Sequence, residues 1–183
     1  MITRPLRKAI QKFYVGCSNV ETGKAEYLPI TDMKEEIDRM RASASLPLVS
    51  KIVKTAGMKL LDGGCTDSIP VKAFAKMGYD KDVVVLTRHK GYRKEKEGIG
   101  LTKLVYRKYP KFVKAVYKRP DVYNHTLDEI EKWEKEGKIF VIRPSVPLSI
   151  GRMEADPKKL KEVYELGRDD ALRQIAAMKE WLN

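Results

Sequence analysis

The spacing of apolar and polar residues predicts short strands at the start of the chain. Residues 12–19 form a β-rich run, and a turn leads from them into a second run at residues 25–29, which is typical of a hairpin. Farther along, residues 51–55 and 58–61 have the composition of two more short strands joined by a tight turn. The last of these strands is predicted to present Asp62 at its end.

Two helices are predicted, one after the first two strands and one after the strand at residues 58–61. Asp32 and Glu35 have the spacing of a capping box, and we expect the helix behind them to reach the small residues before Pro47. Its apolar face consists of Met33, Ile37 and Met40. Pro70 suits the first position of a second helix, which Gly78 ends.

The order of the later elements indicates an α/β layered domain. Residues 83–86 are four consecutive apolar residues, which is typical of a strand buried on both faces, as in a parallel sheet. Thr126 and Glu129 have capping-box spacing and predict another helix, and residues 138–143 predict a strand. Asp156 opens a last helix, whose apolar face is expected to pack on the sheet.

Positive charge is concentrated between Arg88 and Arg119. The formal net charge of the 183 residues is +12, and this segment holds twelve Lys or Arg against two acids. An apolar stripe runs through it at helical spacing, and Pro110 is expected to divide it into two helices or to kink one. Cations follow the stripe at spacings of three or four residues: Lys103, Arg107, Lys111, Lys114 and Lys118.

Three interpretations of this basic segment stay open. The favoured one is a solvated helix face over a packed core. The second is a surface that binds anionic membrane lipids, to which each nearby Lys or Arg contributes about 1 kcal/mol. The third is a nucleic-acid surface with tyrosines stacked on bases, and it is the least favoured because no recognised nucleic-acid motif accompanies the charge.

Asp62, followed by Gly63 and Gly64, is the candidate catalytic residue. Glycine accepts positive φ and lets a neighbouring backbone or ligand come close, so these residues can present a carboxylate on a tight turn. Taken alone, the three residues are more typical of an ordinary turn. The competing acid, Asp67, is expected to cap the following helix or to turn the loop.

The residues around this turn resemble those of a known family. The likeness is carried by residues 41–47 (RASASLP), 61–64 (LDGG) and 69–71 (IPV), and it extends to residues 15–23, 83–93 and 139–153. Together they resemble the second half of a bacterial patatin-like phospholipase, over nearly the whole chain. In that family a Ser–Asp dyad hydrolyses acyl esters of lipids without a catalytic histidine. The resemblance implies that Asp62 is the aspartate of such a dyad.

The family's nucleophile and oxyanion hole have no counterpart in this sequence. They lie upstream, in a Gly-x-Ser-x-Gly elbow and a Gly-rich loop, and neither pattern occurs here. We therefore expect residues 1–183 to be the C-terminal half of a longer enzyme or a truncated gene product. The implied fold is a partial patatin-like α/β fold, with a central, mostly parallel sheet flanked by helices and the N-terminal half of the domain missing.

Ser43 and Ser45 lie in the stretch of small residues that precedes Pro47. Close packing of a helix end is the favoured interpretation of these residues, whereas the resemblance implies only that the segment lies near the active site. Neither serine has the strained strand-to-helix elbow that exposes a nucleophile. We accordingly expect no esterase activity from this polypeptide alone.

The cysteines and histidines do not indicate a second kind of chemistry. Cys17 and Cys65 are too few for a disulfide framework or a structural zinc site, and each is expected to be reduced and buried. Cys65 as a nucleophile would need a histidine base, but His89 and His125 lie in polar stretches well downstream. No metal site and no cofactor are predicted.

Length and hydropathy favour one globular unit over residues 1–183. Residues 1–87 are its base-bearing part, and residues 88–183 are a basic, helical extension with one strand. No apolar run approaches the length of a membrane span, and residues 1–10 lack the apolar core of a signal peptide. A cytoplasmic protein is expected, and peripheral contact with the membrane would follow from the second interpretation of the basic segment.

Two functions follow from these observations. The first is the base-bearing part of a serine lipid acyl hydrolase, which acts on a phospholipid or another lipid ester and needs the missing N-terminal half as its partner. The second is a non-catalytic basic module that binds an anionic membrane surface or, less favoured, nucleic acid.

Overall fold

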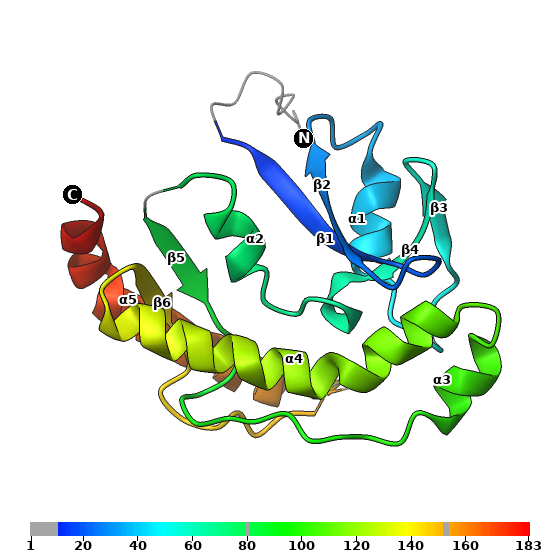
Figure 1. The fold of residues 1–183 in the computed structure, drawn as a ribbon. Helices are drawn as coiled ribbons and strands as arrows, with labels where there is room; N and C mark the ends of the chain where they lie inside the picture. The colour runs from blue at the N-terminus through cyan, green and yellow to red at the C-terminus, as the bar shows by residue number, and fades with distance from the viewer. Residues whose placement is uncertain (1–10, 80, 152–153) are drawn as a thin grey trace. The chain divides into compact units, whose positions relative to one another are not determined.

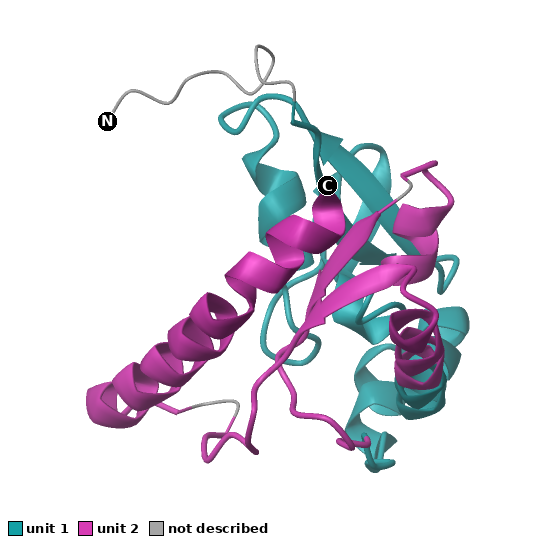
Figure 2. Cartoon of the chain, turned by 90° about the vertical axis from the view of Figure 1, so that its left-hand side faces the viewer, with its two compact units in different colours: residues 1–70, 94–125 teal, residues 71–93, 126–183 magenta. Residues whose placement is uncertain are grey.

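The computed structural model describes residues 11–79, 81–151 and 154–183. The chain divides into two compact units (Figure 2), each with helices and strands, which confirms the α/β class. Unit 1 consists of residues 1–70 and 94–125, and unit 2 consists of residues 71–93 and 126–183.

Unit 1 is built on a four-stranded sheet in the order β2-β1-β4-β3 (Figure 1). Its strands are β1 (Phe13–Asn19), β2 (Ala25–Ile30), β3 (Val53–Thr55) and β4 (Met58–Asp62), as predicted. All three pairings are antiparallel, so the mostly parallel central sheet that we expected is not what unit 1 contains. Tight turns join β1 to β2 and β3 to β4, and a strand that follows a tight turn pairs antiparallel with its predecessor.

Helix α1 (Ile37–Ser43) covers this sheet, packing on β1 and β3. The predicted capping box is wrong in one member. Asp32 accepts the amide of Glu35 at 3.2 Å, but the carboxylate that reaches back is that of Glu36, which accepts the amides of Thr31 at 2.6 Å and Asp32 at 3.1 Å. Residues 33–36 form a turn rather than the first turn of the helix, so the expected spacing is displaced by one residue.

Two apolar clusters stabilise unit 1. The first joins the sheet to α1 and contains Val15, Cys17, Leu28, Ile30, Ala42, Val53 and Leu60. The second lies under the segment after residue 94 and contains Val20, Leu61, Cys65, Tyr106 and Phe112. Leu60 and Leu61 are neighbours on β4 that point to opposite clusters, so β4 is buried on both faces just before Asp62.

The basic segment forms helices α3 (Gly100–Val105) and α4 (Pro110–Lys135). Pro110 is the first residue of α4, which confirms that it divides the segment into two helices. The helix that we predicted to begin at Thr126 is wrong, because α4 continues through this residue without a break. A capping-box spacing is a local signal, and here an uninterrupted helix overrides it.

Unit 2 contains a two-stranded parallel sheet of β5 (Asp82–Val85) and β6 (Ile139–Ile142). The predicted strands and the parallel pairing are therefore confirmed for this pair. The prediction that residues 83–86 are buried on both faces is wrong. Val84 and Leu86 are buried, whereas Val85 on the other face is 68% exposed.

Helices α2 (Val71–Ala75) and α5 (Pro157–Leu182) complete unit 2, with α2 against β5 and α5 against β6. Asp156 accepts the amide of Lys158 at 2.9 Å, which confirms the predicted start of α5. The predicted apolar face of α5 is covered only in part, since Leu160 and Tyr164 are exposed.

Candidate active site and basic surface

Asp62 lies at the junction between β4 and a short 3-10 helix, η2 (Gly63–Cys65). Its Oδ1 atom accepts the amide of Gly64 at 2.7 Å, so the carboxylate caps this helix. Its own amide donates to the carbonyl oxygen of Ser45 at 2.9 Å. The Gly64 amide therefore holds the half-buried carboxylate, and the contact with Ser45 holds the Asp62 backbone at the end of the strand.

The two glycines are required by close approach rather than by backbone conformation. A Cβ atom on Gly63 would lie 2.5 Å from the carbonyl oxygen of Gly16, and one on Gly64 would lie 2.9 Å from Oδ1 of Asp62. Neither glycine has a positive φ. Of the two properties of glycine that we considered from the sequence, only the absence of a side chain matters here.

The second carboxylate oxygen of Asp62 is uncommitted. Within the described ranges, no residue donates a hydrogen bond to Oδ2 and no cation forms an ion pair with this carboxylate. A half-buried aspartate with one oxygen fixed and the other available is able to accept a proton from a hydroxyl that approaches from outside.

Residues that the sequence did not single out support the turn. The hydroxyl of Ser18 donates to the carbonyl oxygen of Asp62 at 2.7 Å and lies 2.8 Å from the hydroxyl of Thr66. Ser18 is fully buried. A serine at an inward-facing position of the predicted first strand is the sequence signal that could have pointed to this role, since a buried hydroxyl needs a hydrogen-bond partner. Arg119 lies beside the turn, with Nη2 3.5 Å from the Cβ position of Gly64, and its Nε is buried without a partner among the described residues.

The structure places Ser43 and Ser45 near the turn but directs both hydroxyls elsewhere. The hydroxyl of Ser43 donates to the carbonyl oxygen of Gly16 at 2.7 Å, and that of Ser45 donates to the carbonyl oxygen of Arg41 at 2.7 Å. Ser45 is brought to Asp62 through its backbone. Neither hydroxyl meets the Asp62 carboxylate, so neither serine takes the place of a nucleophile in this arrangement.

Asp67 binds a side chain, and no helix amide in the described part of the chain donates to it, which corrects the first of the two roles expected from sequence, that of a helix cap. Its Oδ2 accepts the hydroxyl of Tyr27 from β2. Burial, and then this hydrogen bond to Asp67, raise the pKa of Tyr27 far above its usual range. Each of these two aspartates thus has one carboxylate oxygen bound and the other without a partner among the described residues. The bound oxygen of Asp67 accepts from a side chain of the sheet, whereas that of Asp62 accepts from the backbone of the turn.

Both cysteines are buried and free of disulfides. Burial, followed by the negative charge of Asp62, raises the pKa of Cys17 to about 11 and that of Cys65 to about 12. A thiol with so high a pKa is a poor nucleophile at neutral pH, which argues against Cys65 in that role. Among the described residues, no group of three or more His, Cys, Asp or Glu is placed to hold a metal ion.

The five cations that we predicted as an anion-binding set are all exposed. Lys103 lies on α3, Arg107 lies between α3 and α4, and the first turns of α4 carry the remaining three, Lys111, Lys114 and Lys118. None forms an ion pair with a residue in the described part of the chain, whereas Lys96, in the same unit, pairs with Asp121 at 3.1 Å. Their charge is therefore available to a ligand.

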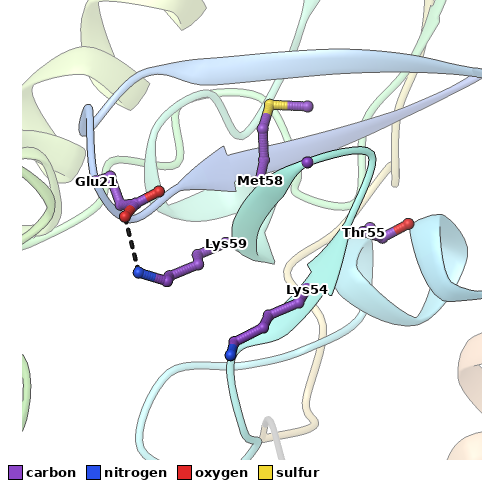
Figure 3. Close-up of a pocket in the computed structure, with 6 residues that line it drawn as sticks. Glu21, Lys54, Thr55, Met58 and Lys59 are labelled. Atoms are coloured by element: carbon purple, nitrogen blue, oxygen red, sulfur yellow. Dashed lines mark hydrogen bonds and ion pairs between the residues drawn. The ribbon is translucent and has the colours of Figure 1, made fainter.

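A surface pocket lies at the β3–β4 turn (Figure 3). It is lined by Glu21, Lys54, Thr55, Gly57, Met58 and Lys59. Lys59 and Glu21 form an ion pair of 2.8 Å, which raises the pKa of Lys59. Asp62 is not one of the lining residues, so this pocket does not hold the candidate carboxylate.

Comparisons with known proteins extend over part of the chain. Residues 109–183 match a family described as "Domain of unknown function (DUF6363)". The chain is also similar to the "Uncharacterized protein YjjU" of Escherichia coli (strain K12), with 29% identity over 140 residues. This match covers 72% of the chain but only 38% of the relative, so the chain corresponds to less than half of that protein.

The helices were also compared with the requirements of a membrane span. Within the described residues, none combines the length and the apolar character that crossing a bilayer demands.

Proposed function

We propose that this chain supplies the catalytic base, Asp62, of a patatin-like serine hydrolase that acts on a phospholipid or another lipid ester. The nucleophilic serine and the oxyanion hole come from a polypeptide segment that these residues do not contain, the N-terminal half of the domain. The parallel β5–β6 pair is consistent with a larger, mostly parallel sheet completed by that half.

The observation that carries the proposal is the uncommitted Oδ2 atom of Asp62. The Gly64 amide fixes the carboxylate through Oδ1 at 2.7 Å, and Oδ2 has no partner among the described residues. An aspartate that served only as a helix cap would need the first contact but not the second feature.

The proposed reaction uses this oxygen twice. Asp62 first accepts the proton of the serine hydroxyl while the serine oxygen attacks the ester carbonyl, and the proton then passes to the departing alcohol. Asp62 next accepts a proton from water, which attacks the acyl-enzyme. The fatty acid leaves and the proton returns to the serine oxygen, so the base ends in its starting state.

A chimera tests the proposal, because the chain alone is expected to be inactive. The N-terminal half of a patatin-like hydrolase, with its Gly-x-Ser-x-Gly elbow, is fused ahead of residue 11, and turnover of a short-chain nitrophenyl ester is measured. We expect turnover from the fusion and a loss of about 100-fold or more in kcat for Asp62→Asn, the range of general-base catalysis. The asparagine oxygen still accepts the Gly64 amide, so the turn is retained.

Asp67→Asn is the matched control, since Asp67 lies in the same loop but is bound to Tyr27. It is expected to leave turnover within about threefold of the parent chimera, far below the general-base range. Equal losses in both variants, or a folded chimera with no turnover, would contradict the proposal. So would ester hydrolysis by the 183-residue chain alone that Asp62→Asn abolishes.

A further inference from the structure

A solvent-exposed turn in unit 1 carries three aliphatic side chains. Leu46, Leu48 and Val49 follow α1, and their side chains are 47%, 45% and 75% exposed. Single exposed apolar residues are ordinary on a protein surface, but three in four consecutive positions form a patch that calls for a partner.

This turn is held in a conformation that leucine disfavours. Leu48 has a φ of 70°, in the left-handed region that residues with a Cβ rarely adopt. The amide of Ser50 donates to the carbonyl of Leu46 at 2.9 Å, and the amide of Leu48 donates to the hydroxyl of Tyr106 at 3.1 Å. The turn is therefore fixed with its aliphatic side chains toward solvent.

Helix α3 adds a second aliphatic group next to this turn. Leu101, Leu104 and Val105 are spaced at i, i+3 and i+4 and are 60%, 66% and 54% exposed. Thr102 forms the buried side of α3, and Tyr106, which is also buried, is the first residue after the helix. Because the hydroxyl of Tyr106 is bound to Leu48, the exposed turn and α3 are joined.

Four cations lie close in sequence to the aliphatic residues of α3. Lys103 lies on α3, Arg107 and Lys108 follow it, and Lys111 lies in the first turn of α4. All four are exposed, and none forms an ion pair with a residue of the described ranges. We call the turn at residues 46–49, the exposed side of α3 and these four cations the α3 surface.

We propose that the α3 surface docks on an anionic lipid bilayer, with its leucines in the acyl boundary and its cations on the lipid phosphates. Exposed leucines bordered by lysine and arginine are the composition of an interfacial membrane contact. Nucleic acid would match the cations but not the aliphatic side chains. A second copy of the chain would bring the same positive charge and be repelled. The proposal does not depend on Asp62.

Co-sedimentation of the purified 183-residue chain with lipid vesicles tests this. We expect binding to vesicles of equal parts phosphatidylcholine and phosphatidylserine, weakening with added salt, and little binding to phosphatidylcholine alone. Replacing Lys103, Arg107 and Lys111 together by glutamine is expected to weaken binding about 100-fold, from about fivefold per cation.

A second variant separates insertion from charge attraction. Leu48→Ser, Leu101→Ser and Leu104→Ser together are expected to weaken binding at least about tenfold at unchanged net charge. All three side chains are exposed, so the far-ultraviolet circular dichroism and the melting temperature should not change.

Helix α5 provides matched controls in unit 2. Its exposed leucines at 160, 172 and 182 are replaced by serine in one variant, and its exposed lysines at 158, 161 and 179 by glutamine in the other. Both controls should bind as the parent does. Equal weakening by a control and its α3 counterpart would overturn the proposal, as would full binding by the leucine variant.

Two further outcomes would assign the α3 surface to another partner and so overturn the proposal. One is tight, salt-dependent binding of single-stranded RNA without binding to anionic vesicles. The other is a dimer in light scattering that the leucine variant converts to a monomer while the parent fails to bind vesicles.

Discussion

The turn at Asp62 and the contact made by Asp170 use the same side chain in opposite ways. Asp170, on α5, is 3% exposed, and both its oxygens are bound: Oδ2 accepts the amide of Ser145 at 2.9 Å, and Oδ1 pairs with Arg173. Asp62 is half-buried, binds one amide through Oδ1, and leaves Oδ2 without a partner among the described residues.

This difference separates a structural carboxylate from a candidate base. A carboxylate with both oxygens bound stabilises the segments that it joins, and protonating it would weaken at least one of these contacts. Asp62 has an oxygen that can accept a proton while the other oxygen keeps its contact with the Gly64 amide. The following predictions test the distinction, from the largest expected effect to the smallest.

Gly63→Ala is expected to have the largest effect on folding. Its Cβ would lie 2.5 Å from the backbone oxygen of Gly16, and neither strand nor turn can move without breaking the β1–β4 pairing. We expect a loss of about 3 kcal/mol or more in the free energy of unfolding, measured by urea denaturation. Gly16→Ala is the control, because its Cβ meets nothing within 4 Å. Equal losses would show that the close approach is not what requires Gly63.

Asp170→Ala is expected to cost about 2 kcal/mol of unfolding free energy, because it leaves the Ser145 amide without its acceptor and removes the pairing with Arg173. Urea denaturation at neutral pH measures it. Asp169→Ala is the control, since the side chain of Asp169 is exposed and its contact with Arg168 is 3.9 Å long. A cost below about 0.5 kcal/mol would show that the buried contact contributes little.

The contribution of Asp170 to the free energy of unfolding should depend on pH. Burial alone would raise the pKa of Asp170, but hydrogen bonds from Ser145 and Arg173 outweigh it, and the pKa is lowered. A lowered pKa in the folded state gives stability that is present above the unfolded pKa and lost as the pH falls through the folded one. Stability curves of the parent and of Asp170→Ala should therefore converge in acid; curves that stay parallel would contradict this.

Asp82→Asn is expected to stabilise the protein at pH 7 by about 1 kcal/mol. Asp82 is 6% exposed, its Oδ1 has no partner among the described residues, and burial raises its pKa. Because the pKa of Asp82 is higher in the folded state than in the unfolded state, burial disfavours the ionised form. Stability is therefore lost as the pH rises from the unfolded pKa through the folded pKa. The asparagine should remove that loss, so the gain should vanish below the unfolded pKa. A neutral or destabilising effect in thermal denaturation at pH 7 would contradict this account.

Much of unit 1 follows from its sequence, because its signals are local. The four strands, the turn before Met58 and the break at Pro110 depend on residues next to one another. The error over the sheet has a physical cause. The resemblance to patatin-like phospholipases implied a mostly parallel sheet, whereas the short connections between β1 and β2 and between β3 and β4 make these pairs antiparallel.

The surroundings of Asp62 could be predicted only in part. The acid and its glycines stand together in the sequence, but the contacts that position them come from residues distant in the chain: Gly16, Ser18, Ser45 and Arg119. No spacing rule connects these positions. The same is true of the α3 surface, where Leu48 and Tyr106 are 58 residues apart.

The smallest effect on stability and the largest on activity should come from the same substitution, and Asp62→Asn measured in the ester-hydrolysing chimera is the most direct test. We predict a change of at most about 0.5 kcal/mol in unfolding free energy, because the amide oxygen still caps Gly64, with a loss of about 100-fold or more in kcat. A fall in kcat of less than about threefold would show that Asp62 is a helix cap and not a base. So would a larger fall in kcat that is accompanied by a loss of unfolding free energy well above about 0.5 kcal/mol.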